Sequence, residues 1–285
     1  MYTLINGNEL SRTMRAEMAE EAAQFTESRG RQIGLAVILA GEDSASKVYV
    51  RNKIRACEQV GIRSFSYYLP EDVAEKDMEE LVQSLVDNDE VDGILVQLPM
   101  PKHLDSEKIL KLIPAEKDVD GFSVSNMGKL ALKQDCLVAC TPNGVMQMLK
   151  RNGIDPKGKC ATVVGRSNIV GKPMAMLLLN ADATVTVCHS KTPDLKEKCL
   201  GADILVAAIG KPKFITADMV KEGAVVIDVG MDRDENGKLC GDVDFENVKD
   251  KCSYITPVPG GVGPMTITML MYNTIEAAKA RTRSI

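Results

Sequence analysis

The chain has 285 residues, of which 45% are hydrophobic and 26% are charged, and its net charge is −5 at pH 7. The length fits one large or two medium domains of an ordinary globular protein. The acidic balance, without a basic run, argues against a nucleic-acid-binding protein. No apolar run approaches the roughly 18 residues that a membrane span requires, and the first residues lack the regions of a signal peptide.

The cysteines and histidines point to a reducing compartment rather than to a metal site. Eight cysteines are scattered without a C-x-x-C pair, and the only histidines are His103 and His189. Zinc coordination and a disulfide framework are therefore not expected. We predict a soluble cytoplasmic protein with free thiols, no metal, and neither nucleic-acid nor membrane partners.

Helices and strands alternate in the first half of the chain. Apolar residues recur every three to four positions between residues 10 and 25, which predicts an amphipathic helix. Buried-strand runs at 33–41 and 91–99 and an alternating strand from 64 to 69 are separated by two helices, at 43–61 and 76–87. This order predicts a parallel sheet with helices on both faces.

The pattern restarts after residue 140. Thr141 is a predicted N-cap and Gly153 a predicted stop of a helix, and a short helical segment precedes it. Shorter β-branched strands follow near 161–165, 184–188, 204–208 and 224–229, and a final helix runs from about 264 to 280. The predicted fold class is α/β, with two doubly wound units of which the second is Rossmann-like.

The helix at 43–61 carries a lysine on the side predicted to face inward. At 100° per residue, one side collects Lys47, Arg51, Arg55 and Glu58, and the other collects Ser46, Tyr49, Val50, Lys53, Cys57 and Val60. Lys53 therefore points toward the interior, one turn after Tyr49. The alternative is that its ammonium group extends past the apolar neighbours to water.

A glycine-containing turn joins the strand at 161–165 to a helix. Gly165 ends the strand, and Gly171 and Pro173 lie at the helix start. Backbone N–H groups at such a helix start face an anion, which indicates a dinucleotide site. The spacing is G-x-S-x-x-x-G rather than G-x-G-x-x-G, so a structural turn without a ligand remains the alternative.

The next strand indicates which dinucleotide binds. An acidic residue at its end would bind the ribose 2′-hydroxyl of NAD. Here the strand is followed by His189, Ser190 and Lys191, and Arg166 lies in the glycine turn. A hydroxyl and two cations suit a 2′-phosphate, so NADP is favoured over NAD. A solvated polar loop is the alternative.

Three further stretches carry polar groups where the predicted sheet ends. Gln97 ends a buried run, Asp118 and Asp120 precede Gly121, and residues 256–266 pack three prolines and three glycines into one loop. Ligands of open parallel sheets bind beyond the carboxyl ends of the strands, and the helix of Lys53 starts at that same edge. Each residue also has a structural alternative, Asp120 as a turn cap and Gln97 as a satisfied core amide.

An ordered set of motifs resembles one known family. From about residue 41 to 278 the chain reads SASKVYVRNK, DGILVQLPMP, PAEKDVDGF, CTPNG, GRSNIVGKP, CHSKT, IDVG, GDVDF and PVPGGVGPMT…NTIEAA. Together these resemble the bifunctional methylenetetrahydrofolate dehydrogenase/methenyltetrahydrofolate cyclohydrolases. Two positions depart from the family pattern: Met100, where Leu is more usual, and Ala139, where Pro is common. Neither change affects a side chain with a chemical role.

The resemblance implies an activity and a domain plan. It implies oxidation of 5,10-methylenetetrahydrofolate to 5,10-methenyltetrahydrofolate with NADP, then hydrolysis to 10-formyltetrahydrofolate. The folate would lie in a cleft between a catalytic, folate-binding domain (1–145 with the C-terminal helix 264–285) and a Rossmann-like NADP-binding domain (146–263). The family also suggests a homodimer.

The resemblance also implies residue roles. Lys53 would be the acid/base group with Gln97 as its polar neighbour, Tyr49 would stack on the folate ring system, and Asp120 would read the amino-pyrimidine edge. The implied substrate-binding residues are Ser46, Tyr49, Val96, Gln97, Leu98, Asp120, Pro259, Gly260, Gly261, Val262 and Thr266. The implied cofactor-binding residues are Gly165, Arg166, Ser167, Ile169, His189, Ser190 and Met231.

Two rival hypotheses remain. Short-chain NADP dehydrogenases also use Tyr-x-x-x-Lys, but there the glycine loop comes first, whereas Tyr49 precedes Gly165 by over a hundred residues. A non-catalytic dinucleotide-binding regulator would not need an intact set of Tyr49, Lys53, Gln97 and Asp120.

Overall fold

The computed structural model describes residues 1–283 as an α/β protein of two compact units. The six-stranded unit contains Met1–Arg12 and Thr141–Thr266, and the three-stranded unit contains Thr13–Cys140 and the segment from Ile267 onward. Their three boundaries fall inside helices α1 (Gly7–Arg29), α6 (Cys140–Arg151) and α10 (Val262–Arg283). The last two residues of the predicted C-terminal helix 264–285 lie outside the described residues.

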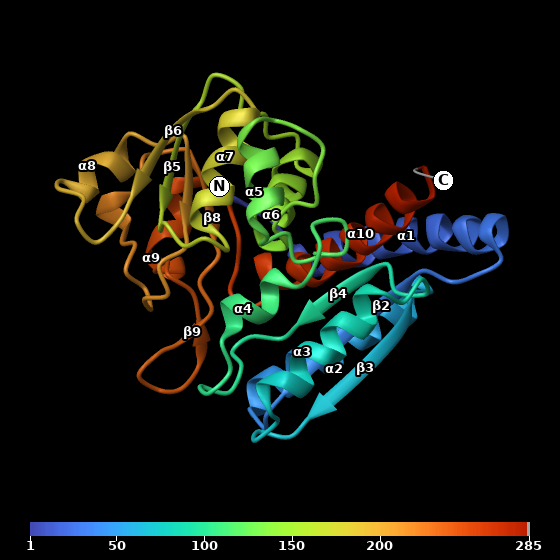
Figure 1. Cartoon of the computed structure of the whole chain (residues 1–285). Helices are drawn as coiled ribbons and strands as arrows, with labels where there is room; N and C mark the ends of the chain where they lie inside the picture. The colour runs from blue at the N-terminus through green and yellow to red at the C-terminus, as the bar shows by residue number, and fades with distance from the viewer. Residues whose placement is uncertain (284–285) are drawn as a thin grey trace. The chain divides into compact units, whose positions relative to one another are not determined.

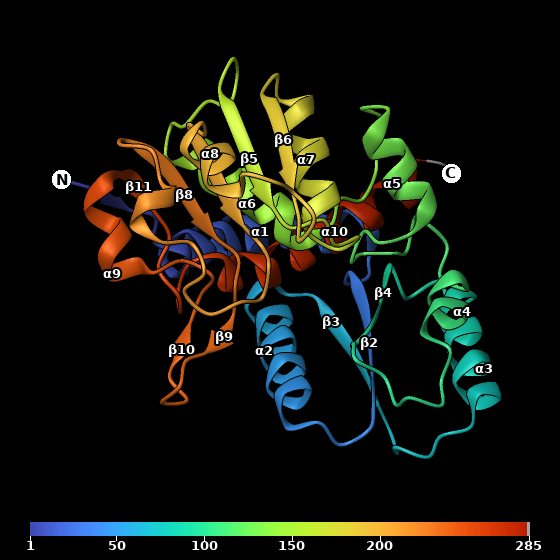
Figure 2. The same ribbon diagram turned by 90° about the vertical axis from the view of Figure 1, so that its left-hand side faces the viewer.

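The three-stranded unit has a fully parallel sheet. Strand β2 (Gly34–Ala40) lies between β3 (Arg63–Leu69) and β4 (Gly93–Val96). Every residue of β2 is buried because helices cover both faces, with α2 (Ser44–Val60) on one side and α3 (Glu75–Val86) and α4 (Ser106–Lys111) on the other (Figure 2). The predicted β-α-β-α-β order is confirmed, and the short α4 was not predicted.

The chain after α4 adds a further segment beside β4. Asp118 forms a parallel bridge with Ile94, whose N–H donates to the carbonyl of Lys117 at 2.8 Å. The chain turns directly after this bridge, because the N–H of Gly121 donates to the carbonyl of Asp118 at 3.0 Å, and Asp120 lies in that turn. Helices α5 (Val124–Ala131) and α6 (Cys140–Arg151) follow.

The predicted start of α6, with Thr141 as N-cap and Pro142 as the first helical residue, was wrong by two residues. The helix begins at Cys140, and the hydroxyl of Thr141 lies 2.9 Å from the hydroxyl of Thr266 instead of capping the helix. The predicted stop at Gly153 is confirmed, because this glycine adopts a left-handed φ of 71°.

The six-stranded unit also has a parallel sheet, in the order β1-β11-β8-β7-β5-β6. The four predicted strands are β5 (Cys160–Val164), β6 (Thr184–Cys188), β7 (Ile204–Ala207) and β8 (Ala224–Asp228). Strands β1 (Thr3–Leu4) and β11 (Cys252–Ile255) were not predicted. Since β6 and β7 flank β5 on opposite sides, the strand order reverses at β5, and the glycine turn follows this switch point.

Helices cover both faces of this sheet. Helices α6 and α7 (Gly171–Asn180) lie on one side, and α8 (Leu195–Leu200) and α9 (Phe245–Val248) lie on the other (Figure 1). The second face forms an apolar cluster that includes Val164, Leu205 and Val226. A hairpin of β9 (Asp232–Arg233) and β10 (Leu239–Cys240) and the 3₁₀ turns Ala217–Met219 and Lys249–Lys251 complete the unit.

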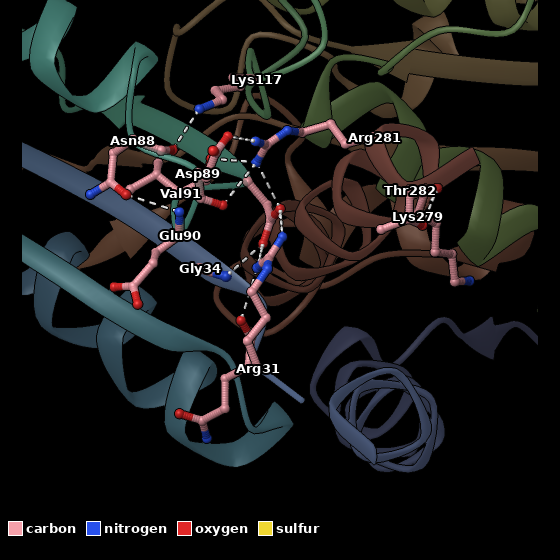
Figure 3. Close-up of polar contacts among 12 residues, drawn as sticks. Arg31, Gly34, Asn88, Asp89, Glu90, Val91, Lys117, Lys279, Arg281 and Thr282 are labelled. Atoms are coloured by element: carbon pink, nitrogen blue, oxygen red, sulfur yellow. Dashed lines mark hydrogen bonds and ion pairs between the residues drawn. The ribbon is translucent and has the colours of Figure 1, made fainter. Parts of the chain in front are cut away.

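A buried carboxylate ties α10 to the start of the three-stranded sheet. The Asp92 side chain is fully buried and accepts hydrogen bonds from both terminal nitrogens of Arg31 at 2.8 Å, from Arg281 at 2.9 Å and from the N–H of Gly34 at 2.9 Å. The two arginines approach each other from different elements (Figure 3). Nearby, the Lys117 ammonium donates to the carbonyls of Val86 and Asn88. Paired charge therefore holds the amino end of β4.

We predict that Asp92→Ala destabilises the protein by about 3 kcal/mol, because it leaves two arginines without their shared carboxylate. Asp89 also pairs with Arg281 but is fully exposed, so Asp89→Ala should leave the free energy of unfolding nearly unchanged. Urea unfolding of both variants measures the difference. Equal free energies of unfolding would contradict a structural role for Asp92.

Candidate functional site

Helix α2 carries Lys53 and Tyr49 as the sequence predicted. The carboxylate of Asp43 accepts from the N–H of Ser46 at 2.7 Å and caps the helix start, and Gly61 ends it with a φ of 81°. The burial follows the predicted sides: Ser46, Val50, Cys57 and Val60 are buried, Tyr49 and Lys53 are half-buried, and Arg51, Arg55 and Glu58 are exposed. Lys53 therefore lies on the inward side of α2.

A side-chain hydrogen bond links α2 to the end of β4. The Lys53 Nζ donates to the Gln97 Oε1 at 3.0 Å. The Gln97 amide group is oriented by a second bond, from its Nε2 to the Leu98 carbonyl at 2.6 Å, and its backbone N–H donates to the carbonyl of Ile38. The amide oxygen therefore faces the lysine, and Lys53 does not simply extend to solvent.

Asp120 belongs to the same polar group. Burial raises the pKa of its carboxyl to about 6, the positive charge of Lys53 lowers this pKa, and the negative charge of Asp118 raises it. Burial also raises the pKa of the Tyr49 phenol. An amine, an oriented amide and a carboxylate with a pKa near neutrality form a site for proton transfer and hydrogen bonding.

The glycine turn of the six-stranded unit is too tight for side chains. Gly165 has a φ of 134°, and a Cβ there would lie 2.1 Å from the carbonyl oxygen of Ala208. A Cβ on Gly171 would lie 2.3 Å from the carbonyl oxygen of Gly165. The Ser167 hydroxyl accepts from the N–H groups of Val170 and Gly171, at 3.2 and 3.3 Å, and orders the start of α7.

The residues predicted to bind a 2′-phosphate lie on neighbouring turns. Arg166 follows β5 and Ser190 follows β6, and both are exposed. The turn after β6 is held by His189, whose N–H donates to the Thr192 hydroxyl at 2.9 Å and whose Nδ1 accepts from the Lys191 N–H at 3.2 Å. The glycine turn and these groups fit an anionic dinucleotide.

Large apolar side chains are exposed at the same end of the sheet. Ile169 in the glycine turn is 47% exposed, and Met231 after β8 is 49% exposed. Such side chains can cover the flat rings of a dinucleotide.

The proline–glycine segment 256–266 packs against the start of α1, and it is a loop only as far as Gly261, because α10 already begins at Val262. The N–H of Asn8 donates to the carbonyl of Gly260 at 3.2 Å, and a Cβ on Gly7 would lie 1.8 Å from the Gly261 carbonyl oxygen. Gly261 and Val262 are buried, Gly260 and Thr266 are half-buried, and Pro259 is exposed.

The predicted folate residues therefore divide between the units. Ser46, Tyr49, Lys53, Val96, Gln97, Leu98 and Asp120 belong to the three-stranded unit, and Pro259, Gly260, Gly261, Val262 and Thr266 belong to the six-stranded unit.

Two buried carboxylates in the six-stranded unit were missed by the sequence analysis. Asp228 accepts from the N–H groups of Gly230, Asp242 and Val243 at 2.9–3.0 Å, and Asp242 accepts from those of Ile209 and Lys211 at 2.6 and 2.7 Å. Burial raises the pKa of Asp228 to about 7. These two carboxylates order the loops after β7 and β8. The IDVG and GDVDF motifs, which contain them, are the sequence signal that could have identified them.

Comparison with known proteins finds matches over both units. The family model described as "Tetrahydrofolate dehydrogenase/cyclohydrolase, catalytic domain" matches residues 5–120, and that of the "NAD(P)-binding domain" of the same family matches residues 139–282. The bifunctional protein FolD of Campylobacter hominis is 58% identical over 282 residues, which cover 99% of each chain.

Solved structures show the same similarity. The FolD methylenetetrahydrofolate dehydrogenase/cyclohydrolase of Campylobacter jejuni superposes with a TM-score of 0.96 at 50% identity, covering 99% of this chain and 100% of that chain. The FolD of Trypanosoma brucei, complexed with NADP and an inhibitor, gives a TM-score of 0.94 at 39% identity, with 99% of each chain covered.

Proposed function

This chain belongs to the tetrahydrofolate dehydrogenase/cyclohydrolase family, and we propose which of its residues perform the two reactions of that family. The enzyme oxidises 5,10-methylenetetrahydrofolate with NADP and hydrolyses the methenyl product to 10-formyltetrahydrofolate, in one-carbon metabolism. The resemblance drawn from the ordered motifs is thereby confirmed. The residue assignment rests on two observations. Lys53 donates a hydrogen bond to Gln97, and the positive charge of Lys53 lowers the pKa of the Asp120 carboxyl.

We assign the proton transfers of hydrolysis to Lys53. Water adds to the methenyl carbon and gives up one proton, and the bond from that carbon to N5 then breaks as N5 gains a proton. The hydroxyl left on the carbon releases its own proton to solvent and becomes the formyl C=O, so that one proton is released overall. An amine beside the reacting carbon can accept the first proton and return one to the nitrogen. Gln97 supports this role. Its Nε2 donates to the Leu98 carbonyl, and this bond orients the amide so that its oxygen accepts from the Lys53 Nζ.

The oxidation depends on positioning more than on proton transfer, because the folate nitrogens stabilise the developing cation. NADP supplies the hydride acceptor when it is bound. Tyr49 offers a half-buried ring for the pteridine, and the Asp120 carboxylate offers acceptors for the amino-pyrimidine N–H groups. Ser46, Val96 and Leu98 complete the surface on this unit.

We assign NADP to the glycine turn. Gly165 and Gly171 leave room for a phosphate at the start of α7, and Ser167 and Ile169 belong to the same turn. Arg166 and Ser190 supply the charge and hydroxyl for the 2′-phosphate, with His189 holding the second turn. Met231 lies exposed after β8. The Trypanosoma brucei relative, solved with NADP, supports this assignment.

We further propose a cytoplasmic homodimer whose catalytic domain spans 1–145 and 264–285 and whose NADP-binding domain spans 146–263. The eight cysteines are free, which suits a reducing compartment. Within residues 1–283, no helix has the length and apolar character needed to cross a bilayer.

We predict that Lys53→Met lowers methenyltetrahydrofolate hydrolysis by about 100-fold or more while folate still binds, because the proton carrier is removed. Lys53→Arg should also fail, since a guanidinium stays protonated. Lys47→Met, the same change on the same helix, is the matched control and should retain activity. Hydrolysis at a near-normal rate in Lys53→Met would exclude Lys53 from the mechanism.

We predict that Arg166→Ala or Ser190→Ala weakens NADP by about 10-fold and leaves NAD nearly unchanged, since a charged hydrogen bond to the 2′-phosphate is lost. Lys159→Ala removes a charge just before β5, at the other end of the strand from Arg166, and serves as the control. Titration with both dinucleotides measures the ratio. Equal losses for NADP and NAD would contradict the assignment.

We predict that folate affinity falls as the pH is lowered through about 6, where the Asp120 carboxyl takes up a proton and loses acceptor capacity. The Asp120→Asn variant should bind folate weakly at every pH, and its affinity should not show this low-pH limb, the fall in affinity as the pH drops through about 6. Dividing the two binding profiles removes the titration of the folate itself. A ratio that stays constant across this range would contradict the role of Asp120.

A further inference from the structure

The two peptide groups that flank Asp120 are both held by buried side chains. On the amino side, the Val119 carbonyl accepts from the Asn273 Nδ2 at 2.8 Å and from the Cys140 thiol at 3.3 Å. On the carboxyl side, the N–H of Gly121 is shared between the Asp118 carboxylate, at 3.1 Å, and the Asp118 backbone carbonyl, at 3.0 Å. Neither peptide plane can rotate without breaking one of these bonds.

Asn273 reaches this point from helix α10. Its side chain is buried, and its Nδ2 also donates to the Val138 carbonyl at 2.8 Å, so its two N–H bonds join two backbone segments. These segments are in direct backbone contact, because a Cβ on Gly121, whose φ is 74°, would lie 2.5 Å from the Ala139 nitrogen. The Asn273 amide, with its two N–H donors, bridges the carbonyls of both segments.

Asp118 closes the turn on the other side. Besides Gly121, its carboxylate accepts from the N–H of Ser123 at 2.7 Å and from the Asn126 Nδ2 at 3.1 Å. Asn126 is buried in α5 and also donates to the Ala115 carbonyl. The turn that carries Asp120 is thus tied to the helix that follows it.

We propose that Asn273 and Asp118 are positioning residues for folate binding, which fix the direction of the Asp120 carboxylate by holding the peptides before and after it. The proposal rests on the role of Asp120 given above. Neither residue needs to touch the substrate. A carboxylate that is already oriented binds with less loss of conformational freedom than one on a mobile turn.

The first test is Asn273→Leu, which keeps the size of the side chain and removes both donors. We expect the folate dissociation constant to rise about 10-fold, with the NADP dissociation constant unchanged. The matched control is Thr274→Val, which removes a buried hydrogen bond of the neighbouring residue to the Leu270 carbonyl within α10. Its folate affinity should stay within about twofold of the parent.

A double-mutant cycle with Asp120→Ala decides whether Asn273 acts through Asp120. If it does, Asn273→Leu weakens folate binding in the parent but causes no further loss in the Asp120→Ala background. An equal loss in both backgrounds would overturn the inference while leaving the role of Asp120 intact. Full folate affinity in Asp120→Ala alone would instead reject the proposed role of Asp120, and the inference with it.

Asp118→Asn gives an independent measurement if Asn273→Leu fails to fold. The isosteric amide keeps an acceptor for Ser123 but cannot serve every N–H group that the carboxylate accepts. The same cycle with Asp120→Ala should show the same non-additivity. Removing the Asp118 charge should also move the low-pH limb of folate binding to lower pH, because that charge raises the pKa of Asp120. An unmoved limb together with additive losses would contradict the proposal.

Discussion

A parallel strand whose faces are both covered can offer reactive side chains only beyond its last residue. All four residues of β4 are buried, so Gln97 is the first position after the strand where a polar side chain reaches a partner on another element. In β5 the last four residues are buried, and Gly165 and Arg166 follow at once. Both proposed ligand sites therefore begin where a buried strand ends, as the covering of parallel sheets requires.

Charged side chains are paired to different extents at the two ends of the three-stranded sheet. At the amino end of β4, Asp92 is fully buried and satisfied by two arginines and a backbone N–H. Beyond the carboxyl end, Lys53 and Asp120 are only half-buried and Lys53 bonds to a neutral amide. Full pairing stabilises the sheet, whereas incomplete pairing leaves acceptors and a proton carrier for a substrate.

The pKa of Asp120 results from opposing effects in one small volume. Burial and the charge of Asp118 favour the protonated carboxyl, and the charge of Lys53 favours the ionised form. Because the value lies near 6, modest changes in the position of either charge change the protonation state near neutral pH. This sensitivity gives a physical reason for the bonds that hold the peptides on both sides of Asp120.

The amino-acid sequence by itself determined most of the longer helices and strands and the positions of the proposed site residues. Strands β2, β3 and β6 and helix α2 lie within about a residue of their predicted limits, because period-2, buried-run and 3.6-residue patterns are strong over such lengths. The inward side of Lys53 followed from that same periodicity, and the ordered motifs identified the family.

Only the tertiary structure decided which distant residues complete these sites. Strand β1 has two residues, too few to show a period, and it forms only by pairing with β11. The bond from Asn273 to Val119 joins positions 154 residues apart, and the buried roles of Asp228 and Asp242 depend on backbone N–H groups of other loops. Contacts of this kind are set by packing between elements, and local propensity leaves no record of them.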